Sequence, residues 1–111
     1  MMNILKTVNG HLERRDKPEP GCWVNLVAPS TEEANSVAEL CGVPLDYLTD
    51  FLDADERARV EVEDNIITMV VRAPMPNTKN PQVPFITLPI GIIITPDYIV
   101  TCCAAEGDLV T

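Results

Sequence analysis

The chain has 111 residues, 46% of them hydrophobic and only 5% aromatic, and 17 Asp and Glu against 8 Lys and Arg give it a net charge of −9. This length predicts one domain with a single core, and a core of Val, Ile and Leu favours strands. The acidic balance excludes a nucleic-acid partner, because affinity for phosphate backbones depends on cationic side chains, and it favours partners that are themselves cationic.

The N-terminal third predicts a hairpin followed by a buried strand. Residues 4–8 and 12–15 flank Asn9-Gly10, the dipeptide best suited to a two-residue turn with positive φ. Residues 22–27 form a short apolar run that is typical of a buried strand, and we expect Trp23 to anchor the core.

The next segment has the pattern of a capped helix. Ser30 can cap its start, Glu33 can close a capping box, and Gly42 can end it. Ala34, Val37, Ala38 and Cys41 share the apolar face. A second helix should open at Pro44 and run to about residue 52 or 54.

The second half of the chain predicts two more hairpins. The strands are expected at residues 59–63, 66–73, 85–95 and 98–104, with turns at Asp64-Asn65 and Pro96-Asp97. Residues 74–84 hold four prolines and predict a flexible excursion. Pro89 cannot donate to a sheet ladder, so it should lie at an edge or a bulge.

This order of elements predicts an α/β (α+β) fold with two short helices on one face of a mixed β-sheet. The strands in residues 90–104 are too apolar to leave one face in water. We therefore expect further helices, C-terminal to this chain, to cover that face. The chain itself should be a single soluble domain, because residues 1–8 lack a signal peptide and prolines interrupt the apolar residues 83–100.

The residues that usually carry catalysis are few. The four cysteines, Cys22, Cys41, Cys102 and Cys103, form no C-x-x-C pair and predict reduced, mostly buried thiols. His11 is the only histidine, and its place beside a hairpin turn predicts a solvent-facing side chain. No nucleotide-binding, zinc-protease or serine-hydrolase motif occurs, so we expect no enzyme activity.

The most informative feature is a row of three aspartates, Asp46, Asp50 and Asp53, on one side of the second predicted helix. Like charges four residues apart repel, so helix energetics do not reward this row. It is either a solvated face or a surface for a hydrated divalent cation. Three ligands on one helix cannot surround a metal, so a carboxylate from a second chain would have to complete such a site.

In order along the chain, six segments resemble the amino-terminal cytoplasmic domain of CorA-type divalent-cation transporters. They are residues 23–26 (WVNL), 29–33 (PSTEE), 42–45 (GVPL), 48–53 (LTDFLD), 57–61 (RARVE) and 66–71 (IITMVV). The resemblance implies part of an α/β/α cytoplasmic domain in a homopentameric inner-membrane channel for Mg²⁺, and sometimes Co²⁺ or Ni²⁺. A zinc-transporting branch shares the architecture.

The resemblance also implies a regulatory role. In that family, divalent ions bridge acidic residues of neighbouring cytoplasmic domains, and loss of the ions favours opening. The sensing aspartate matches Asp50, with Asp46 and Asp53 as outer-shell support, although the often acidic preceding position is Thr49 here. The partner carboxylate, the Gly-Met-Asn pore signature and the membrane helices would lie beyond residue 111, so this segment would not conduct ions.

A second interpretation stays open from the residues alone. The chain could be a free-standing acidic α/β interaction domain whose aspartates only solvate it or dock a basic partner. That interpretation predicts no dependence on metal ions.

Overall fold

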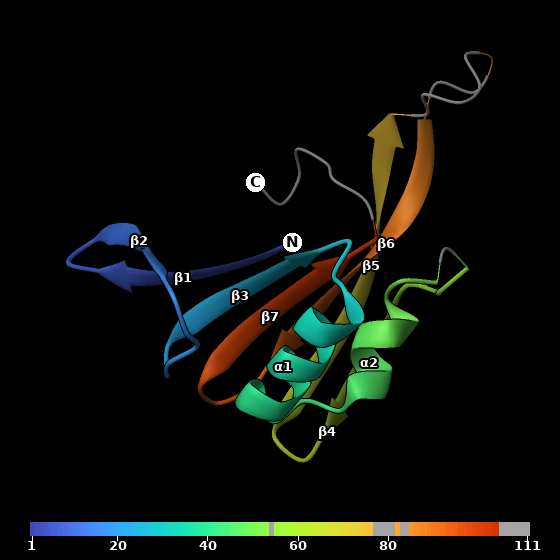
Figure 1. Ribbon diagram of the computed structural model, residues 1–111. Coiled ribbons are helices and arrows are strands. Elements are labelled where there is room, and N and C mark those ends of the chain that lie inside the picture. The colour runs from blue at the N-terminus through green and yellow to red at the C-terminus, as the bar shows by residue number, and fades with distance from the viewer. Residues whose placement is uncertain (54, 77–81, 83–84, 105–111) are drawn as a thin grey trace.

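The computed structural model describes residues 1–53, 55–76, 82 and 85–104, which form one seven-stranded sheet with two helices on one face (Figure 1). No helix in these described residues is long and apolar enough to cross a membrane. The predicted fold class is confirmed. The elements are β1 (Met2–Val8), β2 (His11–Arg15), β3 (Cys22–Val27), α1 (Thr31–Cys41), α2 (Leu45–Asp50), β4 (Arg59–Glu63), β5 (Ile66–Pro76), β6 (Phe85–Ile94) and β7 (Tyr98–Cys103).

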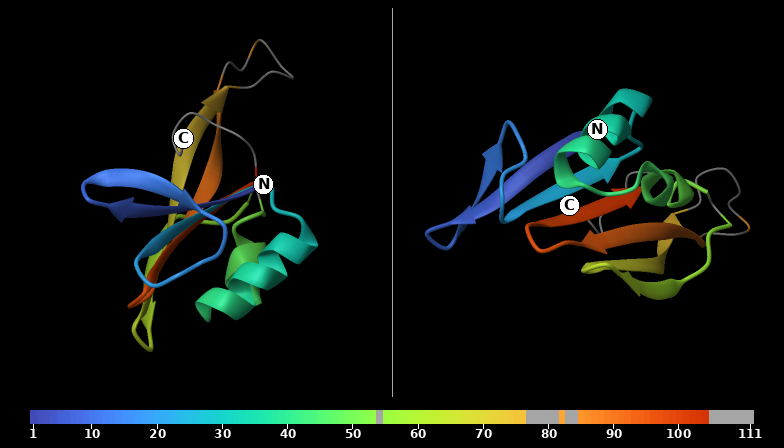
Figure 2. Two further views of the ribbon diagram at one scale, coloured as in Figure 1. Left: turned by 60° about the vertical axis from the view of Figure 1, so that its left-hand side comes forward. Right: turned by 90° about the horizontal axis from the view of Figure 1, so that it is seen from below.

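The sheet is mixed, with the strand order β2-β1-β3-β7-β6-β5-β4. Only the central pair β3 and β7 runs parallel, and every other neighbouring pair is antiparallel. A parallel pair needs a long connection, and here it includes both helices and three strands. The helices cover one face of the sheet, as the view from below in Figure 2 shows.

Two hairpin turns have the backbone geometry that their sequences predict. Asn9 and Gly10 have φ values of 52° and 80°, and Asp64 and Asn65 have 48° and 69°. Positive φ at both central residues is the type I′ geometry, which matches the twist of the flanking strands. The registers Val8 with His11 and Glu63 with Ile66 follow from these two-residue turns.

Helix α1 begins and ends where the sequence predicts. Ser30 Oγ accepts from the Glu33 N–H at 3.1 Å, and Glu33 Oε1 accepts from the Ser30 N–H at 2.9 Å, which is the reciprocal capping box. Gly42 ends the helix with a φ of 70°. The Met1 ammonium also reaches Glu33 Oε1 at 3.1 Å, so the start of β1 is tied to the start of α1.

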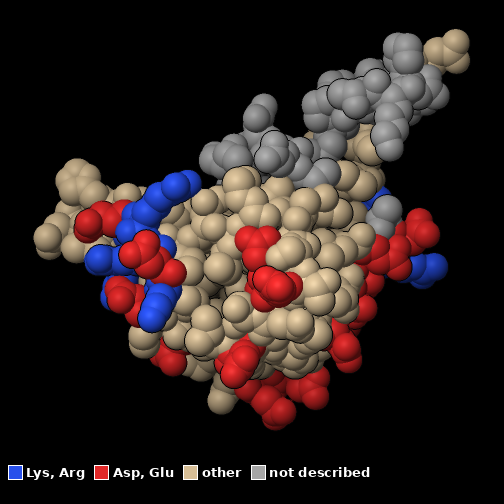
Figure 3. All heavy atoms as spheres, viewed as in Figure 1, with Lys and Arg blue, Asp and Glu red and all other residues tan. Residues whose placement is uncertain are grey.

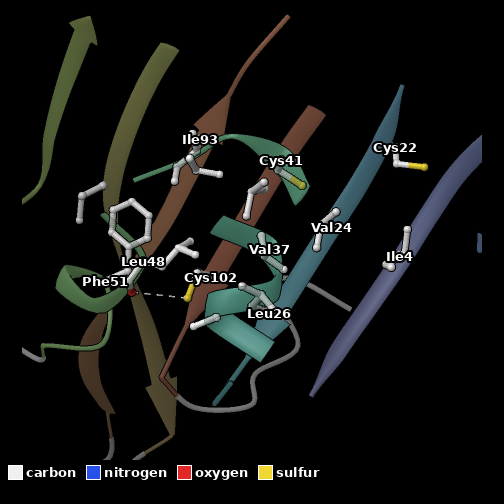
Figure 4. Close-up of a cluster of buried hydrophobic side chains, with 14 residues drawn as sticks. Ile4, Cys22, Val24, Leu26, Val37, Cys41, Leu48, Phe51, Ile93 and Cys102 are labelled. Atoms are coloured by element: carbon white, nitrogen blue, oxygen red, sulfur yellow. Dashed lines mark hydrogen bonds between the residues drawn. The ribbon is translucent and has the colours of Figure 1, made fainter. Parts of the chain in front are cut away.

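The main core lies between the helices and the sheet (Figure 4). Its buried members are Ile4, Cys22, Val24, Leu26, Ala34, Val37, Cys41, Val43, Leu48, Phe51, Val70, Ile93, Val100 and Cys102. Cys103 belongs instead to a small second cluster with Val27, Ala73 and Ile90. The neighbouring cysteines thus point to opposite faces of the sheet, as the two-residue period of a strand requires.

Strand β5 is longer than predicted. It continues past residue 73 to Pro76, so the first part of the expected flexible segment is a strand; most of the remainder, up to residue 84, lies outside the described residues. The added length is possible because β4 pairs with β5 only as far as Val70, so prolines beyond it interrupt no ladder on that side. Pro89 of β6 precedes Ile90, where pairing with β7 ends, and so lies at a local edge as expected.

The face of the sheet away from the helices carries a continuous apolar surface. Across β4, β5, β6 and β7 its positions hold no charged residue, and Val60 and Val62 are 67% and 72% exposed. Trp23 also alternates onto this face, where it is only half-buried and its Nε1–H donates to Thr101 Oγ1 at 2.8 Å. The expectation that Trp23 anchors the main core is therefore wrong, because its strand register points it to the opposite face.

Candidate metal-binding surface

Two buried side chains hold α2 against the sheet (Figure 4). Leu48 and Phe51 are both 0% exposed. The Phe51 ring lies over Gly91 of β6, where an added Cβ would come within 2.0 Å of the ring, so the missing side chain of Gly91 provides the space for it. The Cys102 thiol points at the Leu48 carbonyl, with 3.9 Å between sulfur and oxygen. This packing fixes the backbone on which the neighbouring Asp50 stands.

Helix α2 is shorter than predicted and ends at Asp50 rather than at residue 52 or 54. Beyond it the chain tightens, because the Leu52 N–H donates to the Thr49 carbonyl and the Asp53 N–H to the Asp50 carbonyl, each at 3.1 Å. A six-residue helix gains little from its own propensity, and packing decides where it ends. Asp53 therefore lies outside the helix, and the α-helical spacing applies only to Asp46 and Asp50.

All three predicted aspartates lie at the surface. Asp46 and Asp50 are one helical turn apart on the same side of α2. Asp53 follows beyond the tight turn, and its Oδ1 accepts from the Asp55 N–H at 3.0 Å. Thr49, at the position that is often acidic in the resembling family, turns its hydroxyl to the Asp46 carbonyl at 3.1 Å. We call Asp46, Asp50 and Asp53 the α2 surface.

The electrostatics of the α2 surface favour a cation. The last turn of α2 holds no basic residue, so Asp50 adds negative charge where the helix carbonyls already carry partial negative charge. Residues 46–64 contain eight carboxylates and only two arginines. One of those arginines, Arg59, is paired with Glu56 and Glu61. A bound cation would relieve this repulsion.

The chemistry of the α2 surface suits an ion that keeps part of its water shell rather than an ion enclosed by protein ligands alone. Within the described part of the chain, no three His, Cys, Asp or Glu side chains are grouped so that they could hold a metal ion. Mg²⁺ commonly keeps several of its waters and binds through one or two carboxylates. Asp46 and Asp50 can offer that number from one copy, and the role of the three aspartates stays a prediction.

One contact at the α2 surface was missed by the sequence interpretation. The Tyr47 hydroxyl donates to Glu63 Oε2 at 3.2 Å and so ties α2 to the edge strand β4. This hydrogen bond to a carboxylate is the main reason that the pKa of Tyr47 is raised, and burial and nearby charges add to it. The two residues are sixteen positions apart, and no local pattern marks them as partners.

The remaining chemistry-bearing residues lie elsewhere. All four cysteines are free and buried, as expected. Burial raises the pKa of Cys41 to about 11 and that of Cys102 to about 12, so both thiols stay protonated at neutral pH and are poor nucleophiles and metal ligands. His11 is exposed beside the first turn, as predicted.

Comparison with known proteins gives one family and one fold. Residues 19–110 match the profile of the family described as CorA-like Mg²⁺ transporter protein. The complete structure of the CorA magnesium transporter from Methanocaldococcus jannaschii is similar, with 17% identity and a TM-score of 0.78, and the soluble domain of CorA from the same organism has 19% identity and a TM-score of 0.77. Both alignments cover 96% of this chain, which spans only 33% and 41% of the two matched chains. A search of curated protein sequences finds no significant match.

Proposed function

This chain belongs to the CorA-like Mg²⁺ transporter family, and from that premise we propose that it is a cytoplasmic, metal-sensing domain of a divalent-cation transport protein. The observation that carries the proposal is the family match over residues 19–110, supported by the likeness to the soluble domain of an archaeal CorA. In this proposal the domain regulates transport without conducting ions itself. Its parent is a homo-oligomer, a pentamer by analogy with the family, with this domain on the cytoplasmic side of the membrane.

The regulatory ion in this proposal is a hydrated Mg²⁺ bound at Asp50. Asp50 stands at the C-terminal end of α2, where helix carbonyls and neighbouring carboxylates both attract a cation. Asp46 and Asp53 hold its water shell, and a carboxylate of a neighbouring copy completes the site. Co²⁺, Ni²⁺ or Zn²⁺ could occupy the same oxygen ligands, since these ligands select weakly between divalent ions.

The mechanism is a shift between two arrangements of the ring. An ion that bridges two copies binds more tightly when both carboxylates are in place than when it is held by one copy alone, so it stabilises the closed arrangement by this difference in affinity and no more. When the ion leaves at low Mg²⁺, repulsion between the acidic surfaces favours separation of the copies. Rigid support of the backbone matters here, because the buried Leu48 and Phe51 fix the end of α2 from which the Asp50 carboxylate projects.

The apolar face away from the helices supports the same assignment. Val60, Val62, Val71 and Ile99 on that face are between 43% and 72% exposed. Exposed apolar surfaces of this extent usually mark an interface. We propose that helices from the remainder of the transporter cover this face and complete a three-layer domain.

A melting experiment tests the metal site. Mg²⁺ at ten times its Kd should stabilise the folded chain by about 1.4 kcal/mol, which is roughly 5 °C for a domain of this size. Asp50→Asn should abolish most of that shift. Asp16→Asn is the matched control, since it removes the same charge from an exposed residue outside the α2 surface. NaCl of equal ionic strength separates binding from screening, and equal Mg²⁺ shifts in all three proteins would contradict the site.

A transport experiment tests regulation in the assembled protein. In the full-length transporter in vesicles, Asp50→Asn should shift the internal Mg²⁺ concentration that shuts off uptake to higher values, while the Asp16→Asn protein behaves like wild type. Unchanged shut-off in the Asp50→Asn protein would remove Asp50 from the sensing mechanism.

A further inference from the structure

The charges of this chain separate between the two edges of its sheet. Four of the eight lysines and arginines lie within residues 6–17, on the β1–β2 hairpin and the loop after it, where they outnumber the two carboxylates Glu13 and Asp16. The opposite end, residues 46–64, holds eight of the seventeen carboxylates. Strands β2 and β4 are the two outermost strands, roughly 30 Å apart by the usual spacing between strands. In Figure 3 blue side chains gather at the hairpin, interspersed with red ones, and red side chains predominate over the opposite side.

The cationic edge consists of Lys6, Arg14, Arg15 and Lys17. Lys6 and Arg15 both pair with Glu19, at 3.0 and 3.5 Å, so part of their charge is compensated within the chain. Arg14 donates to the Asn3 side-chain oxygen at 3.0 Å, a neutral partner. Arg14 and Lys17 are exposed and form no ion pair with any residue that the structure describes. These two cations are the ones available to another molecule.

The acidic edge consists of Glu61, Glu63 and Asp64, on β4 and the turn that follows it. All three are exposed. Arg59 pairs with Glu61, and the Tyr47 hydroxyl donates to Glu63. These contacts hold both glutamates in place, but among the described residues only Glu61 has a cationic partner, so the acidic edge keeps a net negative charge.

We propose that the cationic edge of one copy docks on the acidic edge of a second copy. The partner is another copy of this chain, because each copy carries both members of a complementary pair at opposite ends. Copies with a net charge of −9 repel in most orientations, and the head-to-tail orientation is the one that brings opposite charges together. Two different surfaces make a heterologous contact, which closes into a ring or continues as a filament.

The proposal goes beyond the sensing site, because it uses residues at both edges of the sheet and needs no metal ion. Exposed ion pairs are individually weak, so isolated copies should associate only at high protein concentration and low salt. Within one oligomer the local concentration of neighbouring domains reaches the millimolar range, where a weak contact of this kind becomes populated.

Sedimentation equilibrium with EDTA present tests the docking. At high protein concentration and roughly 0.01 M salt, the average mass of wild type should exceed that of one chain, and at roughly 1 M salt it should return to one chain, since the Debye length falls from about 30 Å to about 3 Å. Reversing the cationic edge with Arg14→Glu and Lys17→Glu should give monomers. Reversing the acidic edge with Glu61→Lys and Glu63→Lys should do the same.

The decisive measurement mixes the two reversed proteins. Each retains one native edge and one reversed edge, so an equimolar mixture should associate again as wild type does. Glu32→Lys with Glu39→Lys on α1 is the control, because it changes the net charge as much as the acidic-edge variant does and should still associate. Melting curves verify that every variant is folded. If the Arg14→Glu and Lys17→Glu protein does not fold, the Arg14→Ala and Lys17→Ala protein takes its place in the sedimentation experiment.

Three outcomes would overturn the proposal. They are a wild type that is monomeric at low salt, a mixture that fails to associate, and association that persists in high salt or in both reversed proteins. The last outcome would assign self-association to the apolar sheet face, since salt does not weaken hydrophobic contacts. Because EDTA removes divalent ions, none of these results depends on whether Asp50 binds Mg²⁺.

Discussion

Replacing Gly91 by alanine should destabilise the domain through a single contact. An added Cβ would lie 2.0 Å from Phe51 Cδ2, 2.1 Å from Cγ and 2.3 Å from Cε2, whereas carbon atoms rest at about 3.5 to 4.0 Å. The ring would have to retreat by roughly 1.5 Å, yet Phe51 is 0% exposed, so it would have to move against the side chains that bury it. Overpacking of a core typically costs about 1 to 3 kcal/mol, and full expulsion of a Phe ring about 3 to 5 kcal/mol.

We therefore expect Gly91→Ala to lower the free energy of unfolding by about 3 kcal/mol. The backbone itself favours the change, because Gly91 is not among the glycines with positive φ and glycine within a strand is less stable than alanine by about 0.5 to 1 kcal/mol. A destabilisation must then come from Phe51. Urea unfolding, followed by circular dichroism, measures it, and an unchanged slope with denaturant shows that only the midpoint moved.

A double-mutant cycle identifies the contact. Phe51→Ala removes all three ring atoms that the new Cβ would meet, so it should cost much less in the Gly91→Ala protein than in wild type. Additive effects of the two substitutions, or a Gly91→Ala protein as stable as wild type, would refute the packing argument. The result also bears on the proposed sensing site, since the same ring packs at the end of α2 next to Asp50.

Three further predictions concern stability and reactivity. Ser30→Ala should cost about 1 kcal/mol in a thermal melt because the capping bond to Glu33 N–H is lost, while Ser30→Gly should cost only a few tenths; equal losses would show that the cap is not the cause. The Ser30 N–H and the Met1 ammonium hold the pKa of Glu33 below its ordinary value of 4.5. Its stabilising contribution is therefore complete above pH 4.5 and is lost as pH falls through the lower folded pKa, so Glu33→Gln should flatten the decline of stability below pH 4.5 and the exposed Glu32→Gln should not. Since all four cysteines are buried and the pKa of Cys102 is raised to about 12, a thiol reagent at pH 8 should leave the native chain unlabelled and should label four thiols after unfolding; rapid labelling of the native protein would contradict this burial.

Several local features were predictable because neighbouring residues decide them. The turns at Asn9-Gly10 and Asp64-Asn65 follow from residues that tolerate positive φ, and the limits of α1 follow from Ser30, Glu33 and Gly42. The burial of the apolar face of α1 follows from its 3.6-residue period. None of these depends on a contact far away in the sequence, so the sequence alone sufficed.

Other features depended on contacts between distant residues. Helix α2 ends at Asp50 because packing around Phe51 and Gly91, forty residues apart, outweighs the propensity of a short helix. Trp23 lies on the outer face because the register of β3 against β7 places it there. Strand β5 extends to Pro76 because β4 stops pairing earlier and leaves the prolines unopposed.

The aspartates show both kinds of determination. Their residue types, their surface exposure and the i, i+4 relation of Asp46 and Asp50 follow from the sequence, because a helix that buries Leu48 must turn these residues outward. The tertiary structure decided that Asp53 lies beyond the helix and that Tyr47 is tied to Glu63, since both depend on how α2 sits on the sheet and beside β4. Sequence period sets which way a side chain faces, whereas packing sets where its helix ends and what it meets.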